Sequence, residues 1–277
     1  DLAWLVGAKP AEVVAMNGLT ANLHLLLASF YRPRAERKAI LIERGAFPSD
    51  RYAAVSQIRF HGLDPAEALI EIEPDEPAGT FSPAHLLAEI ERHAERLALV
   101  LLPGVQYRSG EVFPVGAVAA LARRIGCPLG LDLAHAIGNV PLSLHDDGVD
   151  FAVWCSYKYL NAGPGAIAGA FVHERHHGNE ELPRLAGWWG HRPDDRFAMP
   201  EDFRAAPGAE AWALSNPPIL ALAPLRVSLA IFREAGIGAL REKSLALSGR
   251  LREEIVARFG ERIEVLTPLA PERRGAQ

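Results

Sequence analysis

Four polar residues that could do chemistry follow two apolar runs in the middle of the sequence. Asp132 and His135 follow PLGL, and Tyr157 and Lys158 follow DFAVWCS. Burying a lysine directly after an apolar run costs free energy unless its amine is paired or has reacted. A Schiff base with an aldehyde cofactor is one such reaction. The cofactor pyridoxal phosphate (PLP) also needs a carboxylate at its pyridine nitrogen, and Asp132 is suitable. From the spacing alone, the commoner explanation is that the side chain of Lys158 extends to solvent and that Asp132 is an ordinary turn residue.

The same reasoning selects residues elsewhere, because ligands of parallel α/β sheets bind at the carboxyl ends of the strands. Thr20 lies at the predicted start of a helix after the run EVVAM, where it could be the N-cap. Phe47 and Asp50 follow the apolar run KAILIE, and Ser109 follows a run that ends at Pro103. We therefore treat these residues as candidates for the same site.

Two motifs indicate other chemistries. Residues 173–177 read His-Glu-Arg-His-His, which matches the H-E-x-x-H pattern of zinc peptidases. That pattern needs both histidines on one helix face, whereas here a strand-like run precedes it and Gly178 follows. We therefore predict a solvated turn without a metal. The glycine-rich segment 161–169 approaches a dinucleotide fingerprint, but it precedes a strand and contains Pro164, which favours ordinary turns.

Two later segments carry isolated aromatic or polar groups. Trp188 and Trp189 lie between glycines in GWWGH, where they could pack in the core or at an interface, and an indole N–H can donate to a phosphate. Asn216 lies in SNPP, where it could bind a ligand or be the N-cap of the following helix. The residues alone leave both alternatives open.

Alternating apolar runs and amphipathic segments must position these residues. Repeated strand–helix–strand units predict an α/β fold, with a mostly parallel sheet flanked by helices on both faces. The predicted strands are 38–43, 68–74, 97–103, 128–135, 150–160 and 166–174, with 12–16 as a strand or a helical turn. The predicted helices are 20–30, 48–62, 82–96 and 114–126.

After Pro217 the pattern becomes helical. Two long amphipathic segments, 219–236 and 238–260, precede a predicted strand in RIEVL. We place a domain boundary here, with a large α/β domain at 1–235 and the start of a smaller C-terminal α+β domain at 236–277. Because the sequence starts at Asp1 and ends without a closing element, we expect a part of a longer chain, truncated at both ends and without a signal peptide.

The composition is that of an ordinary globular protein. The chain has 277 residues, of which 49% are hydrophobic, and a net charge of −5, so disorder is excluded as the dominant state. A mildly acidic chain without a long basic run argues against nucleic acid or a membrane as partner. Two cysteines, Cys127 and Cys155, cannot form a disulfide framework, which favours a reducing compartment such as the cytoplasm.

Six blocks, in the same order along the chain, resemble the kynureninase family, whose members are PLP enzymes of the aspartate-aminotransferase-like fold (PLP fold type I). The resemblance runs from about Leu5 to Gln277. The blocks are MNGLTANLHLLLASFYRP, AFPSDRYAAVSQIRFHG, LPGVQYRSG, LDLAHAIGNVPLSLHDDGVDFAVWCSYKYLNAGPGAIAGAFVHERH, GWWGH and SNPP.

The resemblance implies roles at the matching positions. Lys158 would carry the cofactor as a Schiff base, and Tyr157 would reach the phosphate or the reacting carbonyl as acid or proton relay. Asp132 would bind the pyridine nitrogen. The other implied cofactor-binding residues are Leu19 and Thr20 at the phosphate, Phe47 stacked on the ring with Asp50 nearby, His135 on the ring side, Ser109 where the family often has Thr, and Trp188 and Asn216 as phosphate donors.

The implied reaction is the hydrolysis of L-kynurenine, or of 3-hydroxykynurenine, to the corresponding anthranilate and L-alanine in tryptophan catabolism. Trp188 and Asn216 are implied to reach the phosphate of a partner subunit, which predicts a homodimer with shared active sites. The alternatives are a desulfurase or aminotransferase of the same fold type, a non-catalytic fragment and, least favoured, a zinc peptidase. A cysteine desulfurase needs a cysteine on a mobile loop, whereas Cys127 and Cys155 lie in or beside strand-like runs.

The family also uses an arginine of its C-terminal domain to bind the substrate α-carboxylate. We expect this arginine beyond Gln277. Arg273 and Arg274 precede the corresponding segment, so we do not assign the role to them.

Overall fold

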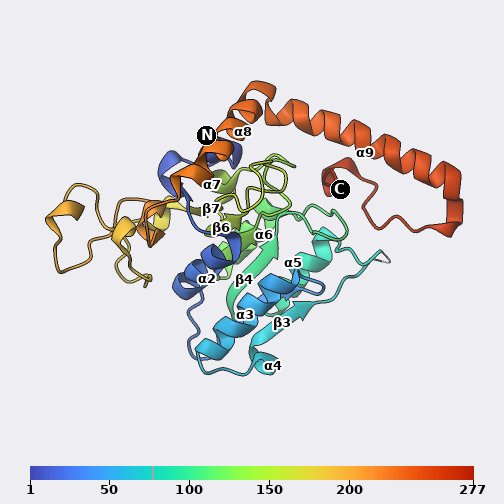
Figure 1. Ribbon diagram of the computed structural model, residues 1–277. Helices are drawn as coiled ribbons and strands as arrows, with labels where there is room; N and C mark the ends of the chain where they lie inside the picture. Colours follow the sequence, from blue (N-terminus) through green and yellow to red (C-terminus); the bar gives the residue numbers. More distant parts are fainter. Residues whose placement is uncertain (77) are drawn as a thin grey trace.

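A single β-sheet forms the centre of the computed structural model, which describes residues 1–76 and 78–277 (Figure 1). The strands are β1 (Val13–Ala15), β2 (Ala39–Glu43), β3 (Leu69–Ile72), β4 (Leu97–Pro103), β5 (Leu129–Asp132), β6 (Phe151–Trp154) and β7 (Gly169–Val172). Among the described residues these strands lie in the order β1-β7-β6-β5-β4-β2-β3.

The middle of the sheet is parallel, which confirms the predicted fold class. Parallel pairings join β3 to β2, β2 to β4, β4 to β5 and β5 to β6, whereas β7 pairs antiparallel with β6 and with β1. β4 is buried from Leu97 to Leu102, as expected for a continuous apolar run covered on both faces. The carboxyl ends of β2, β4, β5 and β6 therefore meet at one edge of the sheet.

Helices account for most of the remaining regular structure. They are α1 (Leu2–Leu5), α2 (Leu19–Phe30), α3 (Pro48–Phe60), α4 (Pro65–Ala68), α5 (Pro83–Arg92), α6 (Val115–Arg124), α7 (Leu144–Asp147), α8 (Ile219–Ala235) and α9 (Ile237–Phe259). None of the helices found in residues 1–76 and 78–277 combines the length and the apolar character that a membrane crossing requires.

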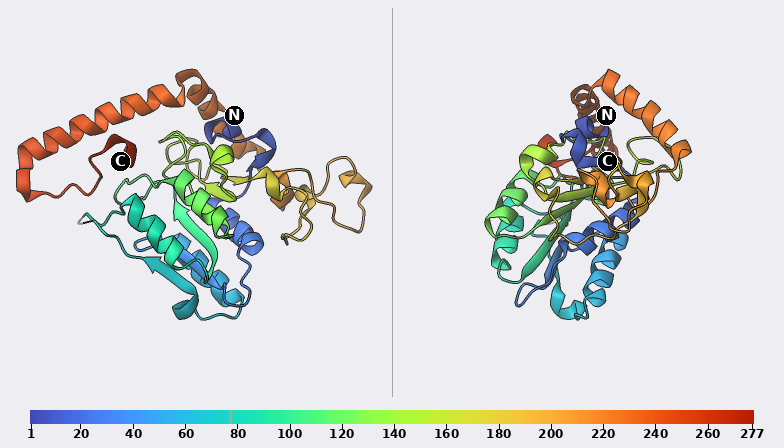
Figure 2. Two further views of the ribbon diagram at one scale, coloured as in Figure 1. Left: turned by 180° about the vertical axis from the view of Figure 1, so that it is seen from behind. Right: turned by 90° about the vertical axis from the view of Figure 1, so that its left-hand side faces the viewer.

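The side chains of β4 alternate between two hydrophobic cores. Val100 and Leu102 belong to the core that includes α5 and α6, whereas Leu99 and Leu101 belong to the core that includes α2 and α3. Figure 2 shows the sheet between these two helical layers. The period-two alternation of a strand thus builds a three-layer domain.

Some predicted element ends are wrong. α2 begins at Leu19 with Gly18 as its N-cap, so Thr20 lies in the first turn and does not cap the helix. β6 ends at Trp154, because the chain leaves the sheet and turns before it returns antiparallel as β7. The N-cap of α8 is Pro218, which excludes Asn216 from the capping role.

The last segment departs from the main body. α9 has no buried residue and extends away from the sheet in both figures. The strand predicted in RIEVL is wrong: residues 262–266 form no strand and pair with neither β1 nor β3, the two end strands of the sheet. The domain boundary at 235/236 stays a prediction, although α8 does end at Ala235.

Candidate active site

A cavity of about 340 Å³ opens at the carboxyl edge of the parallel strands. The ends of β2, β4 and β5 form its floor, the first turns of α2 and α3 form one wall, and the loop after β6 forms another. Its lining comprises Leu19, Thr20, Glu43, Phe47, Ser49, Asp50, Pro103, Val105, Tyr107, Asp132, Ala134, His135, Tyr157 and Lys158. Most of the predicted site residues are therefore brought together in one cavity.

Lys158 projects into this cavity from the loop after β6. Its Nζ lies 2.9 Å from Nε2 of His135 and 5.6 Å from the centre of the Phe47 ring. Burial, and then the positive charge of Lys158, lower the pKa of His135, so its imidazole is neutral and accepts from the ammonium group. The amine is thus held inside the cavity instead of reaching solvent.

Two carboxyl groups lie buried beneath the cavity. Asp132 is the last residue of β5, and its Oδ1 accepts the N–H of Ala134 at 2.6 Å. Burial raises the pKa of Asp132, while burial and the proximity of Asp132 raise the pKa of Asp50. Oδ1 of Asp50 is buried and has no hydrogen-bond partner among the described residues. This pair is suited to a cationic N–H donor placed above it.

The structure adds a third buried carboxyl that sequence reasoning missed. Glu43, the last residue of β2, is 3% exposed and lines the cavity. Burial is the main cause that raises the pKa of Glu43 to about 8. The only signal that could have identified Glu43 was its position at the end of a buried strand, β2, which lies beside β4. Tyr107 was also missed; its ring packs edge-on against Phe47, with ring centres 5.3 Å apart.

The first turn of α2 closes another side of the cavity. The hydroxyl groups of Thr20 and Ser49 lie 3.0 Å apart, which joins the first turns of α2 and α3. The first N–H groups of a helix have no acceptor within the helix, and the helix dipole favours an anion there. Leu19 and Thr20 therefore lie where a phosphate would be stabilised.

Three predicted site residues do not line this cavity. Ser109 is buried, and its Oγ accepts the N–H of Glu111 at 3.3 Å. Trp188 is 44% exposed and packs edge-on against Phe197, with ring centres 5.9 Å apart. Asn216 is exposed just before α8.

The H-E-x-x-H segment does not form a zinc-peptidase helix. Residues 174–176 form a short 3-10 turn after β7, and Nδ1 of His173 accepts the N–H of Arg175 at 3.2 Å. His177 points elsewhere, with its Nε2 at 3.0 Å from the carbonyl oxygen of Val172. The turn predicted for this segment is confirmed, but it is not fully solvated as predicted, because His173 is buried.

Residues 1–268 match the sequence pattern of the family described as class-V aminotransferase. The chain belongs to this family. Class-V aminotransferases depend on PLP. The chain is also 61% identical over 276 residues to a kynureninase from Xanthomonas euvesicatoria pv. vesicatoria, and 62% identical to one from Xanthomonas campestris pv. campestris. Each comparison covers 100% of the chain and 65% of the relative, so the chain spans less than two thirds of these proteins.

Solved structures of other enzymes share this fold. A cysteine desulfurase from Thermococcus onnurineus NA1 superposes with a TM-score of 0.75 at 16% identity, over 98% of this chain and 64% of that protein. The enzyme C-DES, with glycine covalently linked to its PLP cofactor, also superposes with a TM-score of 0.75. The identity is 19%, over 98% of this chain and 68% of that protein. At these identities the likeness concerns the fold alone.

The cavity of this class-V aminotransferase chain fits PLP. The Oδ1 of Asp50, without a partner among the described residues, and the buried carboxyl of Asp132 would suit a protonated ring nitrogen, and Lys158 would offer an amine for a Schiff base. The two cysteines do not suit desulfuration, because both are buried. Burial raises the pKa of Cys127 to about 12 and is also the main cause that raises the pKa of Cys155.

Proposed function

We propose that the whole protein is a PLP-dependent hydrolase that cleaves L-kynurenine or 3-hydroxykynurenine into the corresponding anthranilate and L-alanine. The observation that carries this proposal is the placement of Lys158 and the buried Asp132 in one cavity, in a chain 61% identical to proteins named kynureninase. One water is consumed: its oxygen joins the γ-carbonyl carbon, and the Cβ–Cγ bond breaks.

PLP bound at this site would supply an electron sink for the pair released at the substrate α-carbon. Lys158 would hold the cofactor through its Nζ, and Asp132, with Asp50 beside it, would keep the ring nitrogen protonated. Phe47 and His135 would contact the ring. The first turn of α2, with Thr20, would bind the phosphate.

Proton movement would belong to the cavity's own side chains. Lys158, once freed from the cofactor by substrate, would move the α-proton. Tyr157 lines the cavity but is 51% exposed, so its hydroxyl can exchange protons with solvent. Burial, and then Cys155, raise the pKa of Tyr157, which keeps the phenol protonated as an acid or proton relay. The neutral His135 would keep the Lys158 amine in place.

The attachment of PLP can be tested on the full-length protein. Borohydride reduction followed by peptide mass mapping should place a pyridoxyl group on Lys158. In Lys158→Ala that label should disappear while circular dichroism stays unchanged, since this loop residue contributes little packing. A pyridoxyl group on any other lysine would overturn the assignment.

The reaction needs a separate measurement. Full-length protein with PLP should release an anthranilate and alanine in equal amounts from kynurenine or from 3-hydroxykynurenine. A ratio of the two kcat/KM values then assigns the preferred substrate. A protein that carries PLP on Lys158 and releases alanine from neither compound would exclude kynureninase activity.

We further propose a homodimer in which Trp188 and Asn216 reach the phosphate of the partner subunit. The segment that follows Trp188 projects from the main body in Figures 1 and 2. Some of its large apolar side chains are exposed. Phe197 is 78% exposed and Met199 is 72% exposed, which is typical of a surface that meets a partner.

A mixing experiment tests shared sites. Full-length Lys158→Ala subunits are combined with subunits carrying Trp188→Ala and Asn216→Ala. If sites are shared, one site in each mixed dimer regains all its native groups, so activity partly recovers. Mixed dimers that form without recovery would place the phosphate contacts within one chain.

We also propose a cytoplasmic location, which the two free, buried cysteine thiols support.

A further inference from the structure

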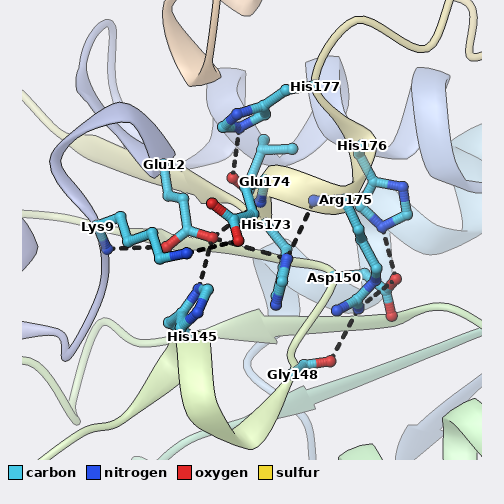
Figure 3. A network of polar contacts seen from close by, with 11 residues as sticks. Lys9, Glu12, His145, Gly148, Asp150, His173, Glu174, Arg175, His176 and His177 are labelled. Atoms are coloured by element: carbon cyan, nitrogen blue, oxygen red, sulfur yellow. Dashed lines mark hydrogen bonds and ion pairs between the residues drawn. The ribbon is translucent and has the colours of Figure 1, made fainter.

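A second cluster of chemically capable side chains lies outside the cavity. Glu12, just before β1, meets His145 of α7 and His173, which follows β7. Figure 3 shows the carboxylate and the two imidazoles pointing toward one another. The proposed reaction uses none of these residues, and only His173 belongs to the H-E-x-x-H segment.

The distances within this cluster are those of a metal-binding set. Oε1 of Glu12 lies 2.9 Å from Nδ1 of His145 and 3.6 Å from Nδ1 of His173, and all three atoms lie within 4.8 Å of one another. Ligands about 2.0–2.1 Å from a tetrahedral Zn²⁺ are separated by about 3.3–3.4 Å. The first two separations differ from this value by about half an ångström or less, and the two Nδ1 atoms would also have to reach this separation for the ion to bind.

Outer contacts fix the ligands in place. The N–H of Lys9 donates to Oε2 of Glu12 and the N–H of Glu174 donates to Oε1, both at 2.8 Å. The rings of His145 and His173 stack with centres 4.9 Å apart and an interplanar angle of 23°, so one ring must rotate to direct both Nδ1 lone pairs at one ion. The carboxylate is fully buried, so it cannot swing away to solvent. Such outer contacts orient ligands and raise metal affinity.

We propose that Glu12, His145 and His173 form a binding site for a divalent transition-metal ion, for which Zn²⁺ is the best match. The ion would replace the proton that His145 donates to Glu12, and the weak hydrogen bond from the partly buried Arg175 N–H to His173 would be lost. Two nitrogen ligands and one oxygen ligand leave a fourth position for water.

The three ligands come from segments far apart in the chain. The ion would therefore join the segment before β1, the turn of α7 and the end of β7. This role is structural and does not depend on the proposed hydrolase activity. Binding at the site adds to stability with the logarithm of the free metal concentration once that concentration exceeds the dissociation constant, because the ligands are apart in the unfolded chain.

Direct metal binding tests the proposal. Zn²⁺ alone is titrated calorimetrically into full-length, PLP-loaded protein and into His145→Ala and His173→Ala variants. Both variants should bind at least tenfold more weakly than wild type, and the Zn²⁺-induced rise in Tm should disappear. Two controls are His177→Ala, the second histidine of the motif, and His135→Ala in the cavity; both should bind Zn²⁺ within twofold of wild type.

Coordination geometry gives an independent readout. Co²⁺ added to wild type should produce the visible bands of a four-coordinate site, and Glu12→Gln should abolish them if it folds. Because Glu12 is buried, its replacement carries a risk to folding. The imidazole of His145 is partly exposed in the wild type, so His145→Ala gives the same test with less risk. No binding to wild type, or equal affinity in wild type and His145→Ala, would overturn the proposal and leave a proton-bridged cluster.

Discussion

Gly130 of β5 lies directly against the ring of Phe151 of β6, so closely that a Cβ added at Gly130 would be 2.2 Å from the ring's Cζ. No side chain fits at that separation, and β5 and β6 are fixed by their pairing. Two residues further along β5 lies Asp132, so this contact sets the position of a site carboxylate as well as the packing of the core.

Gly130→Ala should therefore destabilise the protein by about 2–3 kcal/mol, because the ring must move within a packed core. Urea denaturation of the full-length protein measures this change. The matched control is Gly238→Ala in α9, where an added Cβ meets nothing within 4 Å and should be neutral or slightly stabilising. Equal midpoints for the two variants would show that the sheet adjusts freely.

Asp132→Asn should weaken PLP retention without unfolding the protein. Asparagine keeps the size of the side chain but removes the charge that would hold the ring nitrogen protonated. Loss of one charge-assisted hydrogen bond corresponds to roughly 10- to 100-fold in affinity. Visible absorbance during dialysis measures the dissociation constant, and Asp146→Asn on exposed α7 is the control. An unchanged constant would exclude Asp132 from the ring nitrogen.

Asp150 should make the free energy of unfolding depend on pH in the acid range. Its carboxylate accepts from Arg175 and His176 at 2.7 Å and from the N–H of Leu129 at 2.8 Å. Burial alone would raise the pKa of Asp150, but His176 and Arg175 lower it below its usual 3.8. Because the pKa of Asp150 is lower in the folded state than in the unfolded state, its ionised carboxylate stabilises the fold fully at pH values above the unfolded-state pKa. This stabilisation is lost as the pH falls through the folded-state pKa.

Asp150→Asn should cost about 2 kcal/mol at neutral pH, an amount reduced by the partial exposure of Arg175. The cost should shrink as pH falls below about 4, because the carboxylate of the unfolded wild type is protonated first and the folded carboxylate only at lower pH. Denaturation at several pH values provides the test. A constant difference between variant and wild type at all these values would contradict the assigned charge.

The two cysteines should be inert in the folded protein. Both are buried, and the thiol of Cys127, with its pKa raised to about 12, forms almost no thiolate at neutral pH. Mass spectrometry after iodoacetamide treatment should find neither modified in the native state and both modified in urea. Rapid native labelling of Cys155 would reopen the desulfurase alternative.

The sequence predicted those parts of the fold that depend on local pattern. KAILIE and LALVLLP are continuous apolar runs, and both became buried parallel strands. RIEVL reads equally well as a strand but forms none, because pairing depends on a neighbour that no local pattern contains. The parallel sheet in turn predicted that Asp132 and Lys158 would meet, since both follow strands that end at one edge.

Glu43 could not be predicted in the same way. It ends KAILIE as a single glutamate in no recognisable motif, and its buried surroundings include Gln106, Glu111 and Asp132, which only the three-dimensional fold brings to it. The cluster of Glu12, His145 and His173 has the same origin, because its members are distant in sequence. The roles of Trp188, Asn216 and Ser109 came from family resemblance and stay predictions.

The antiparallel pairing of β7 with β6 has a consequence for the local unfolding of the cavity. Trp154 pairs with Gly169 at the base of the loop that carries Lys158, and the N–H of Ala162 bonds to the carbonyl of Ser156 within it. The same strand end exchanges hydrogen bonds with the chain leading into α2, from Met16 to Ala168 and from Ala168 to Asn17. The lysine loop and the phosphate end of the cavity therefore belong to one cooperative unit, whose amides should exchange with deuterium together and only when β7 separates from the sheet.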